Sequence, residues 1–143
     1  MDNISDPGNV GTLLRSAQAF GFDAVMLTNY SVDPYNPKVV RSSAGSIFGL
    51  TIITATTDEI LRFKKYDRFK LIVADIRGID LHSRKINIKN YSRIVLVLGS
   101  EAKGISDNIL SKADIKIKVG HSDKVESLNV AVAGSIIMKE LYK

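Results

Sequence analysis

Short apolar runs separated by amphipathic stretches are the main pattern along this chain. Runs rich in Val, Ile and Leu predict strands at Ala24–Leu27, Leu50–Ile53, Leu71–Ala74, Ile94–Leu98 and Ile115–Val119. Most of them are continuous rather than alternating, which is typical of strands buried on both faces of a parallel sheet. The pattern therefore favours a sheet that is covered on both sides.

The stretches between the runs carry apolar residues at helical spacing. They predict helices over Val10–Phe20, Pro37–Ser42, Thr57–Lys65, Ser106–Leu110 and Asn129–Leu141. Gly21 is a suitable C-terminal cap for the first helix. Thr57 or Asp58 is a suitable N-terminal cap for the third helix. Alternating strands and helices predict an α/β fold, with a mostly parallel sheet flanked by helices.

The start of the chain is unusual for such a fold. Asp6-Pro7-Gly8-Asn9 is typical of a loop that follows a strand and leads into a helix, but only five residues precede it. We expect either that the first strand is absent or that Met1 is an internal or reassigned start. The segment Met1–Asp6 is polar and acidic, unlike a signal peptide.

Composition narrows the function classes. The 143 residues are 45% hydrophobic and 24% charged, which fits one globular domain over residues 1–143. No apolar run approaches the roughly 20 residues of a membrane helix, so we expect a soluble cytoplasmic protein. The absence of cysteine excludes disulfides, thiolate metal sites and cysteine nucleophiles. His82 and His121 lie too far apart for a metal-ligand pair at helical spacing, so no metal is expected.

The net charge of +5 makes nucleic acid a reasonable partner. The densest basic stretch, Arg62–Lys70, interleaves aromatic and cationic residues. A solvated helix end that leads into a strand explains this stretch equally well.

Three polar segments interrupt the regular pattern. The first segment, Asp6–Gly11, is followed by Arg15. If Asn9 caps the helix, Arg15 lies on that helix with its guanidinium free to act on a ligand. The alternative is that Asn9 is only a cap and Arg15 only a surface residue. The second, Gly99–Gly104, follows a predicted strand at the edge where parallel sheets bind ligands, although an ordinary turn also fits. Its glycine spacing resembles a phosphate loop, but Ile105 stands where that loop requires lysine.

The third polar segment, Val125–Asn129, precedes the last predicted helix. Ser127 or Asn129 is able to cap that helix. Two cap-type residues around Leu128 are more than one cap requires, so one of them is free for another role.

Together these segments resemble the three motifs of the SpoU (TrmH) family of RNA ribose methyltransferases, in the SPOUT superfamily. The matching stretches are Asp6–Ala17 with Phe20-Gly21, Leu96–Ile105 and Val125–Ala133, and Arg41–Phe48 resembles the family's spacer. They follow the family's order and spacing over nearly the whole chain. Two features differ. Val119-Gly120-His121 replaces the usual Ile-Pro-Met. The strand with which the family starts, and the RNA-binding domain that many members carry before it, are not found in this sequence, so we expect residues 1–143 to be a SpoU-type catalytic domain alone or a truncated one.

The resemblance implies a fold with a C-terminal deep trefoil knot that binds S-adenosylmethionine, and homodimers packed through the knot region. It implies methyl transfer to a ribose 2′-hydroxyl of RNA without a metal. The spacer favours ribosomal RNA over transfer RNA as the partner.

The resemblance also assigns residues. It places Arg15 at the 2′-hydroxyl, as a base or as a group that stabilises the developing alkoxide; we favour the second role because arginine keeps its proton. Asn9 and Ser127 would hold Arg15 and a phosphate. Glu101 would organise the second motif, and Asn129 would tie the third motif to the others. Cofactor contacts, largely from the backbone, would fall at Gly99, Val119, Leu128, Ala74, Asp75 and Gly104.

Two other functions stay open at this stage. A knotted RNA-binding or assembly module without activity is favoured by the missing strand and the altered loop at Val119–His121. A small-molecule-binding α/β domain has no supporting motif. The joint presence of five polar motif residues favours the enzyme, and titration with S-adenosylmethionine would separate it from both alternatives.

Overall fold

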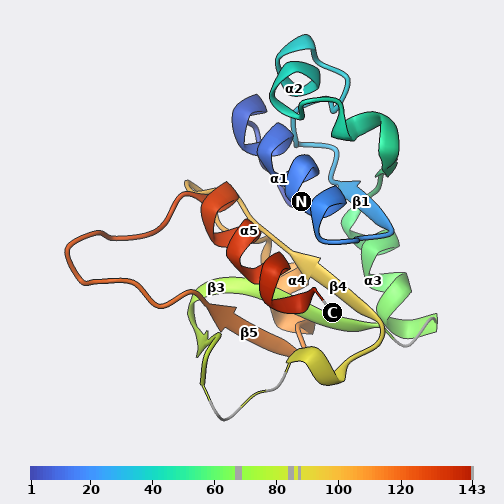
Figure 1. Ribbon diagram of the computed structural model, residues 1–143. Helices are drawn as coiled ribbons and strands as arrows, with labels where there is room; N and C mark the ends of the chain where they lie inside the picture. The colour runs from blue at the N-terminus through green and yellow to red at the C-terminus, as the bar shows by residue number, and fades with distance from the viewer. Residues whose placement is uncertain (67–68, 84–85, 87, 143) are drawn as a thin grey trace.

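The computed structural model describes residues 1–66, 69–83, 86 and 88–142. Asp67 and Arg68 of the predicted basic stretch lie outside the described residues. The helices are α1 (Pro7–Ala19), α2 (Pro37–Ser42), α3 (Thr57–Tyr66), α4 (Asp107–Lys112) and α5 (Val130–Leu141), with 3₁₀ turns η1 (Ser46–Gly49) and η2 (Ile88–Asn90). The strands are β1 (Ala24–Leu27), β2 (Thr51–Thr54), β3 (Lys70–Asp80), β4 (Ile94–Val97) and β5 (Ile115–Lys118). This confirms the predicted α/β fold (Figure 1).

All pairing between the described strands is parallel, as predicted. Among the described residues, β1 and β2 form a two-stranded sheet, and the other three strands form a second sheet with the order β4-β3-β5. The carboxyl ends of β3, β4 and β5 therefore lie along one edge of that sheet, because Val73 is in register with both Val97 and Lys116. Residues that follow these strands are brought together at this edge.

The first residues of the chain connect the two sheets. The Met1 amine donates to the Met26 carbonyl at 2.7 Å, and the Thr28 amide donates to the Met1 carbonyl at 3.0 Å. On the other side, the Asp2 amide donates to the Leu98 carbonyl at 2.8 Å. Met1 and Asp2 thus lie between β1 and β4, where a strand would run. The polar appearance of this segment is misleading, since Met1, Asp2 and Ile4 are all buried.

The start of α1 differs from the prediction. The helix begins at Pro7, because proline suits the first helical position and the Asp6 carboxylate accepts the Asn9 amide at 2.8 Å. Asp6 is therefore the cap, and the prediction that Asn9 caps the helix was wrong. The expected end is confirmed: Gly21 has φ +68°, and the amides of Gly21 and Phe22 close a Schellman motif.

Three other local predictions need correction. β3 continues to Asp80 rather than stopping at Ala74, since its pairing with β5 resumes at Ile79 after an irregularity. The third helix is capped by Thr56, not by Thr57 or Asp58, because Thr56 and Glu59 form a reciprocal capping box. β2 is mostly exposed rather than buried on both faces, as expected of a strand at a sheet edge.

Helices α1 and α5 pack side by side in the centre of the domain (Figure 1). Gly134 of α5 permits this contact, because a Cβ there would lie 2.5 Å from a Leu98 methyl and 2.6 Å from one of Leu13. The buried core includes Leu13, Leu98 and Ile137. This packing fixes the N-terminus of α5 beside the first turn of α1.

Candidate active site

Asn129 joins three parts of the chain that are far apart in sequence. Its Oδ1 caps α5 by accepting the Ala131 amide at 3.0 Å, which confirms it as one of the two predicted cap residues. Its Nδ2 donates to Asn9 Oδ1 at 2.9 Å and to Glu101 Oε1 at 2.8 Å. The same Glu101 oxygen accepts the Val130 amide at 3.1 Å. One side chain of each polar segment therefore takes part in a single hydrogen-bond network.

The turn after β4 presents Glu101 to this network. The Gly104 amide donates to the Ser100 carbonyl at 2.8 Å, and the Lys103 amide donates to Ser100 Oγ at 3.1 Å. Gly104 has φ +66°, which favours glycine. A Cβ on Gly99 would lie 2.4 Å from the Gly104 carbonyl carbon, so closure of the turn requires glycine there too. The geometry of the turn therefore explains glycine at both positions, whether or not a cofactor binds there.

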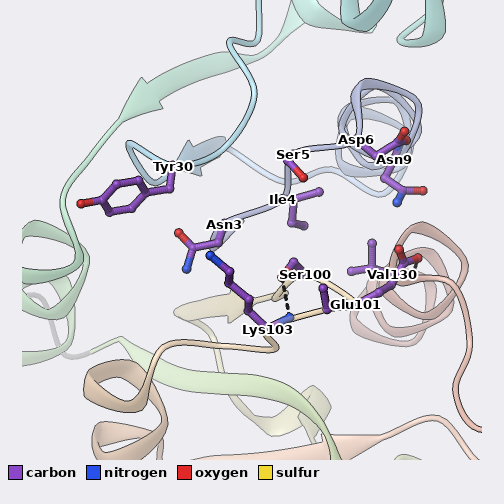
Figure 2. A pocket seen from close by; sticks show the side chains of 11 residues that line it. Asn3, Ile4, Ser5, Asp6, Asn9, Tyr30, Ser100, Glu101, Lys103 and Val130 are labelled. Atoms are coloured by element: carbon purple, nitrogen blue, oxygen red, sulfur yellow. Dashed lines mark hydrogen bonds between the residues drawn. The ribbon is translucent and has the colours of Figure 1, made fainter.

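A crevice of about 450 Å³ opens beside the network, since Asn9 and Glu101 line it. Figure 2 shows the side chains that line this crevice. Its walls are the segment from Asn3 to Asn9, the Ser100–Lys103 turn and Val130, and Tyr30 also lines it. Volumes of this size are typical of ligand sites. The sequence identified Asn9 and Glu101 as candidates but not Asn3, Tyr30 and Lys103. The available signal was the aromatic Tyr30, three residues after the predicted strand Ala24–Leu27.

Arg15 and Ser127 are not part of the network. Both are exposed, and within the described residues no hydrogen bond or ion pair links either to Asn9, Glu101 or Asn129. Arg15 follows Asn9 by six residues, which is a rotation of about 240° around the helix. The two side chains therefore leave α1 in different directions.

Three of the predicted cofactor positions, Ala74, Gly99 and Val119, lie near the carboxyl ends of β4 and β5 in the three-stranded sheet. Ala74 and Val119 are half-buried and pack against the core, and Gly99 follows β4. The segment 119–129 projects as a wide loop (Figure 1), and Leu128 is half-buried at its far end.

Asp75 is bound by a neighbour. Arg77 donates to both carboxylate oxygens of Asp75, at 3.0 Å from Nε and 2.9 Å from Nη2. This hydrogen bonding lowers the pKa of the Asp75 carboxyl against the opposing effect of its partial burial. The carboxylate is therefore charged at neutral pH and already paired.

A second cavity of about 510 Å³ lies between β1 and β4 and was not predicted from the sequence. It is lined mainly by apolar residues, among them Phe20, Phe63 and Leu141. The polar network borders the first crevice instead, so we take that crevice as the candidate site. In the described part of the chain, no cluster of three or more His, Asp or Glu side chains suits a metal ion. None of the described helices is long and apolar enough to cross a membrane.

Comparison with known proteins supports the resemblance. The model of the SpoU rRNA Methylase family matches residues 1–139. An uncharacterised tRNA/rRNA methyltransferase of Borreliella burgdorferi is 34% identical over 100% of this chain and 62% of its own length. The 23S rRNA (guanosine(2553)-2′-O)-methyltransferase RlmP of Bacillus subtilis is 31% identical over 99% of this chain and 56% of its own. The chain thus spans little more than half the length of these relatives.

Solved structures give the same result. An AdoMet-bound rRNA methyltransferase from Sinorhizobium meliloti superposes with a TM-score of 0.89 at 28% identity, over 98% of this chain and 53% of that one. The SpoU methyltransferase AviRb from Streptomyces viridochromogenes, in complex with AdoMet, has a TM-score of 0.85 at 27% identity, over 99% and 54%.

Proposed function

The chain belongs to the SpoU rRNA Methylase family, and we propose that it transfers a methyl group from S-adenosylmethionine to a ribose 2′-hydroxyl of RNA. We propose ribosomal RNA as the substrate, which the Arg41–Phe48 spacer and the 31% identical rRNA 2′-O-methyltransferase RlmP both support. The observation that carries the proposal is the Asn9–Asn129–Glu101 network, which unites all three motifs beside one crevice. We also propose that the enzyme works in the cytoplasm.

The residues at the carboxyl edge of the sheet fit S-adenosylmethionine as cofactor. Half-buried apolar surface at Ala74, Val119 and Leu128 suits an adenine ring, and the ends of parallel strands leave backbone groups free to bind it. AdoMet-bound relatives of the same fold support this assignment. The cofactor supplies an electrophilic methyl group on a sulfonium, so the chemistry requires no metal. We include Asp75 and Gly104 in the proposed cofactor site.

The chain's own residues would position the acceptor and manage its charge. We propose that Arg15 lies at the ribose 2′-hydroxyl and stabilises the negative charge that develops there, because arginine keeps its proton at neutral pH. Ser127 would hold a phosphate. Asn129 and Glu101 would hold Asn9 and the Ser100–Gly104 turn in place, since their hydrogen bonds to each other leave little freedom.

We also propose the trefoil knot and a homodimer that packs through it. The contact between α5 and η2, in the connection from β3 to β4, supports the knot, because a threaded C-terminal segment must pass this connection. Arg15 is exposed and points away from the Asn9 network. A second copy of the chain would therefore complete the site around Arg15.

Substitution of Arg15 tests the assignment. Arg15→Ala should abolish methylation of RNA and leave the affinity for S-adenosylmethionine in calorimetry nearly unchanged, because Arg15 contacts the acceptor and not the cofactor. Retained activity would remove Arg15 from the site. The unaltered chain decides between the enzyme and an inactive knotted RNA-binding or assembly module: failure to bind S-adenosylmethionine would favour the module.

A further inference from the structure

Tyr30 is an aromatic side chain with no structural role in the domain. It is 84% exposed, and its ring makes no stacking, cation–π or hydrogen-bond contact with any described residue. A ring left in water gains nothing for folding, since its apolar surface stays hydrated. Tyr30 nevertheless lines the crevice of the candidate active site.

The backbone beneath Tyr30 is firmly held. The Thr28 hydroxyl accepts the Asn3 amide at 3.0 Å, and the Ser31 amide donates to the Thr28 carbonyl at 2.9 Å. Thr28 itself is buried. The ring therefore projects from a fixed turn, so a partner that stacks on it would order only one side chain.

The charged groups of the crevice are separated. In Figure 2 Tyr30, Asn3 and the Lys103 amine lie toward one end, and Asp6, Asn9 and Glu101 lie toward the other. Both carboxylates are engaged, since Asp6 caps α1 and Glu101 binds Asn129. The Lys103 amine has no partner among the described residues. An aromatic face and a free cation thus share one end of the crevice.

We propose that this end binds single-stranded RNA next to the modified ribose, with a nucleobase stacked on Tyr30 and a phosphate oxygen bound by Lys103. The inference rests on the proposed function, and it assigns the residues that select an unpaired substrate. Stacking on an aromatic ring is open only to a base that is free of the helical stack, and a neighbouring phosphate requires a cation. The chain would therefore prefer a loop or bulge to a duplex.

Substitutions at Tyr30 test this with RNA binding as the readout. Tyr30→Ala should weaken binding of a single-stranded oligonucleotide between about 5-fold and about 150-fold, as expected for one stacked base. Tyr30→Phe keeps the ring and should stay within about 2-fold. Tyr35→Ala is the matched control, because Tyr35 is also exposed, at 64%, but does not line the crevice. Since Tyr30 is exposed, circular dichroism should show each variant folded.

Lys103 is tested through salt. Lys103→Gln should reduce the slope of log affinity against log salt by about 1, as loss of one phosphate contact predicts. Lys112→Gln, at the exposed end of α4, should leave the slope unchanged. A duplex of the same sequence should bind more weakly than the single strand, and Tyr30→Ala should remove most of that difference.

Each result supports or overturns the inference separately from the proposed function. If Tyr30→Ala binds RNA as well as Tyr35→Ala does while the unaltered chain methylates RNA, the inference is wrong and the function stands. If the unaltered chain binds RNA through Tyr30 but does not methylate it, the function is wrong and the binding site stands. Equal affinity for duplex and single strand would also contradict the inference.

Discussion

Substitution of Asn129 is the most informative perturbation of the site. Asn129→Ala removes the cap of α5, at a cost of about 1 kcal/mol. It also removes the hydrogen bonds to Asn9 and Glu101, worth about 1 kcal/mol each at an exposed position. The expected loss is about 3 kcal/mol. Asn129→Ser retains a cap and should lose about 2 kcal/mol.

Thermal and urea unfolding measure these losses. For a domain of this size each kcal/mol lowers Tm by about 2–4 °C, so the alanine variant should melt about 6–12 °C lower. Asn36 is the matched control: it caps α2 in the same way, but its Nδ2 makes no hydrogen bond to a described residue. Asn36→Ser should therefore change stability by no more than about 0.5 kcal/mol.

A double-mutant cycle isolates the network from the cap. Asn129→Ser combined with Glu101→Ala should show a coupling of about 1 kcal/mol, whereas Asn36→Ser with Glu101→Ala should be additive within about 0.5 kcal/mol. Methylation should fall in both Asn129 variants, since Asn9 and the Glu101 turn lose their common anchor. Additive energies for the Asn129 pair would refute the reasoning that the network holds the three motifs together.

Other predictions concern pH and backbone geometry. Burial, partly offset by Asp2, lowers the pKa of the Met1 amine to about 6, whereas the amine of the unfolded chain binds its proton below about pH 8. Urea unfolding should therefore show about 2 kcal/mol of stability lost as the pH falls from 8 to 6, and Nα-acetylation should remove this loss. Gly99→Ala places a Cβ against the Gly104 backbone and should lower the free energy of unfolding by about 3 kcal/mol. A Cβ on Gly104 would meet no atom, so Gly104→Ala adds only the strain of a positive φ and should lower it by about 1 kcal/mol. Arg77→Ala should raise the pKa of Asp75 in a carboxyl NMR titration, because the guanidinium is the main cause of its lowering.

Local pattern was sufficient to predict most elements of this fold. The limits of α2 and the Gly21 cap were correct, because they depend on residues close together in sequence. The extension of β3 to Asp80 was missed, since Arg77 and Gly78 break the apolar run and only the pairing with β5 sustains the strand. The burial of Asp2 was missed for the same reason, because its partner Leu98 is distant in sequence.

In the candidate site, too, the residues could be predicted from local sequence but their contacts could not. The motifs identified Asn9, Glu101 and Asn129, and the structure confirms that they meet. The atoms that join them depend on how α5 packs against α1, which no local pattern contains. The roles of Arg15 and Ser127 stay predictions, since helix geometry directs Arg15 away from Asn9 and the loop before α5 exposes Ser127.

The most direct test of this account is the position of the transferred methyl group. Ribosomal RNA should be incubated with the chain and with S-adenosylmethionine that carries an isotopically labelled methyl, and then digested to nucleosides for mass spectrometry. We predict label on the ribose of a 2′-O-methylnucleoside, and none in the reaction with Arg15→Ala. Label on a base, or ribose label that persists in the Arg15→Ala reaction, would contradict the central claim.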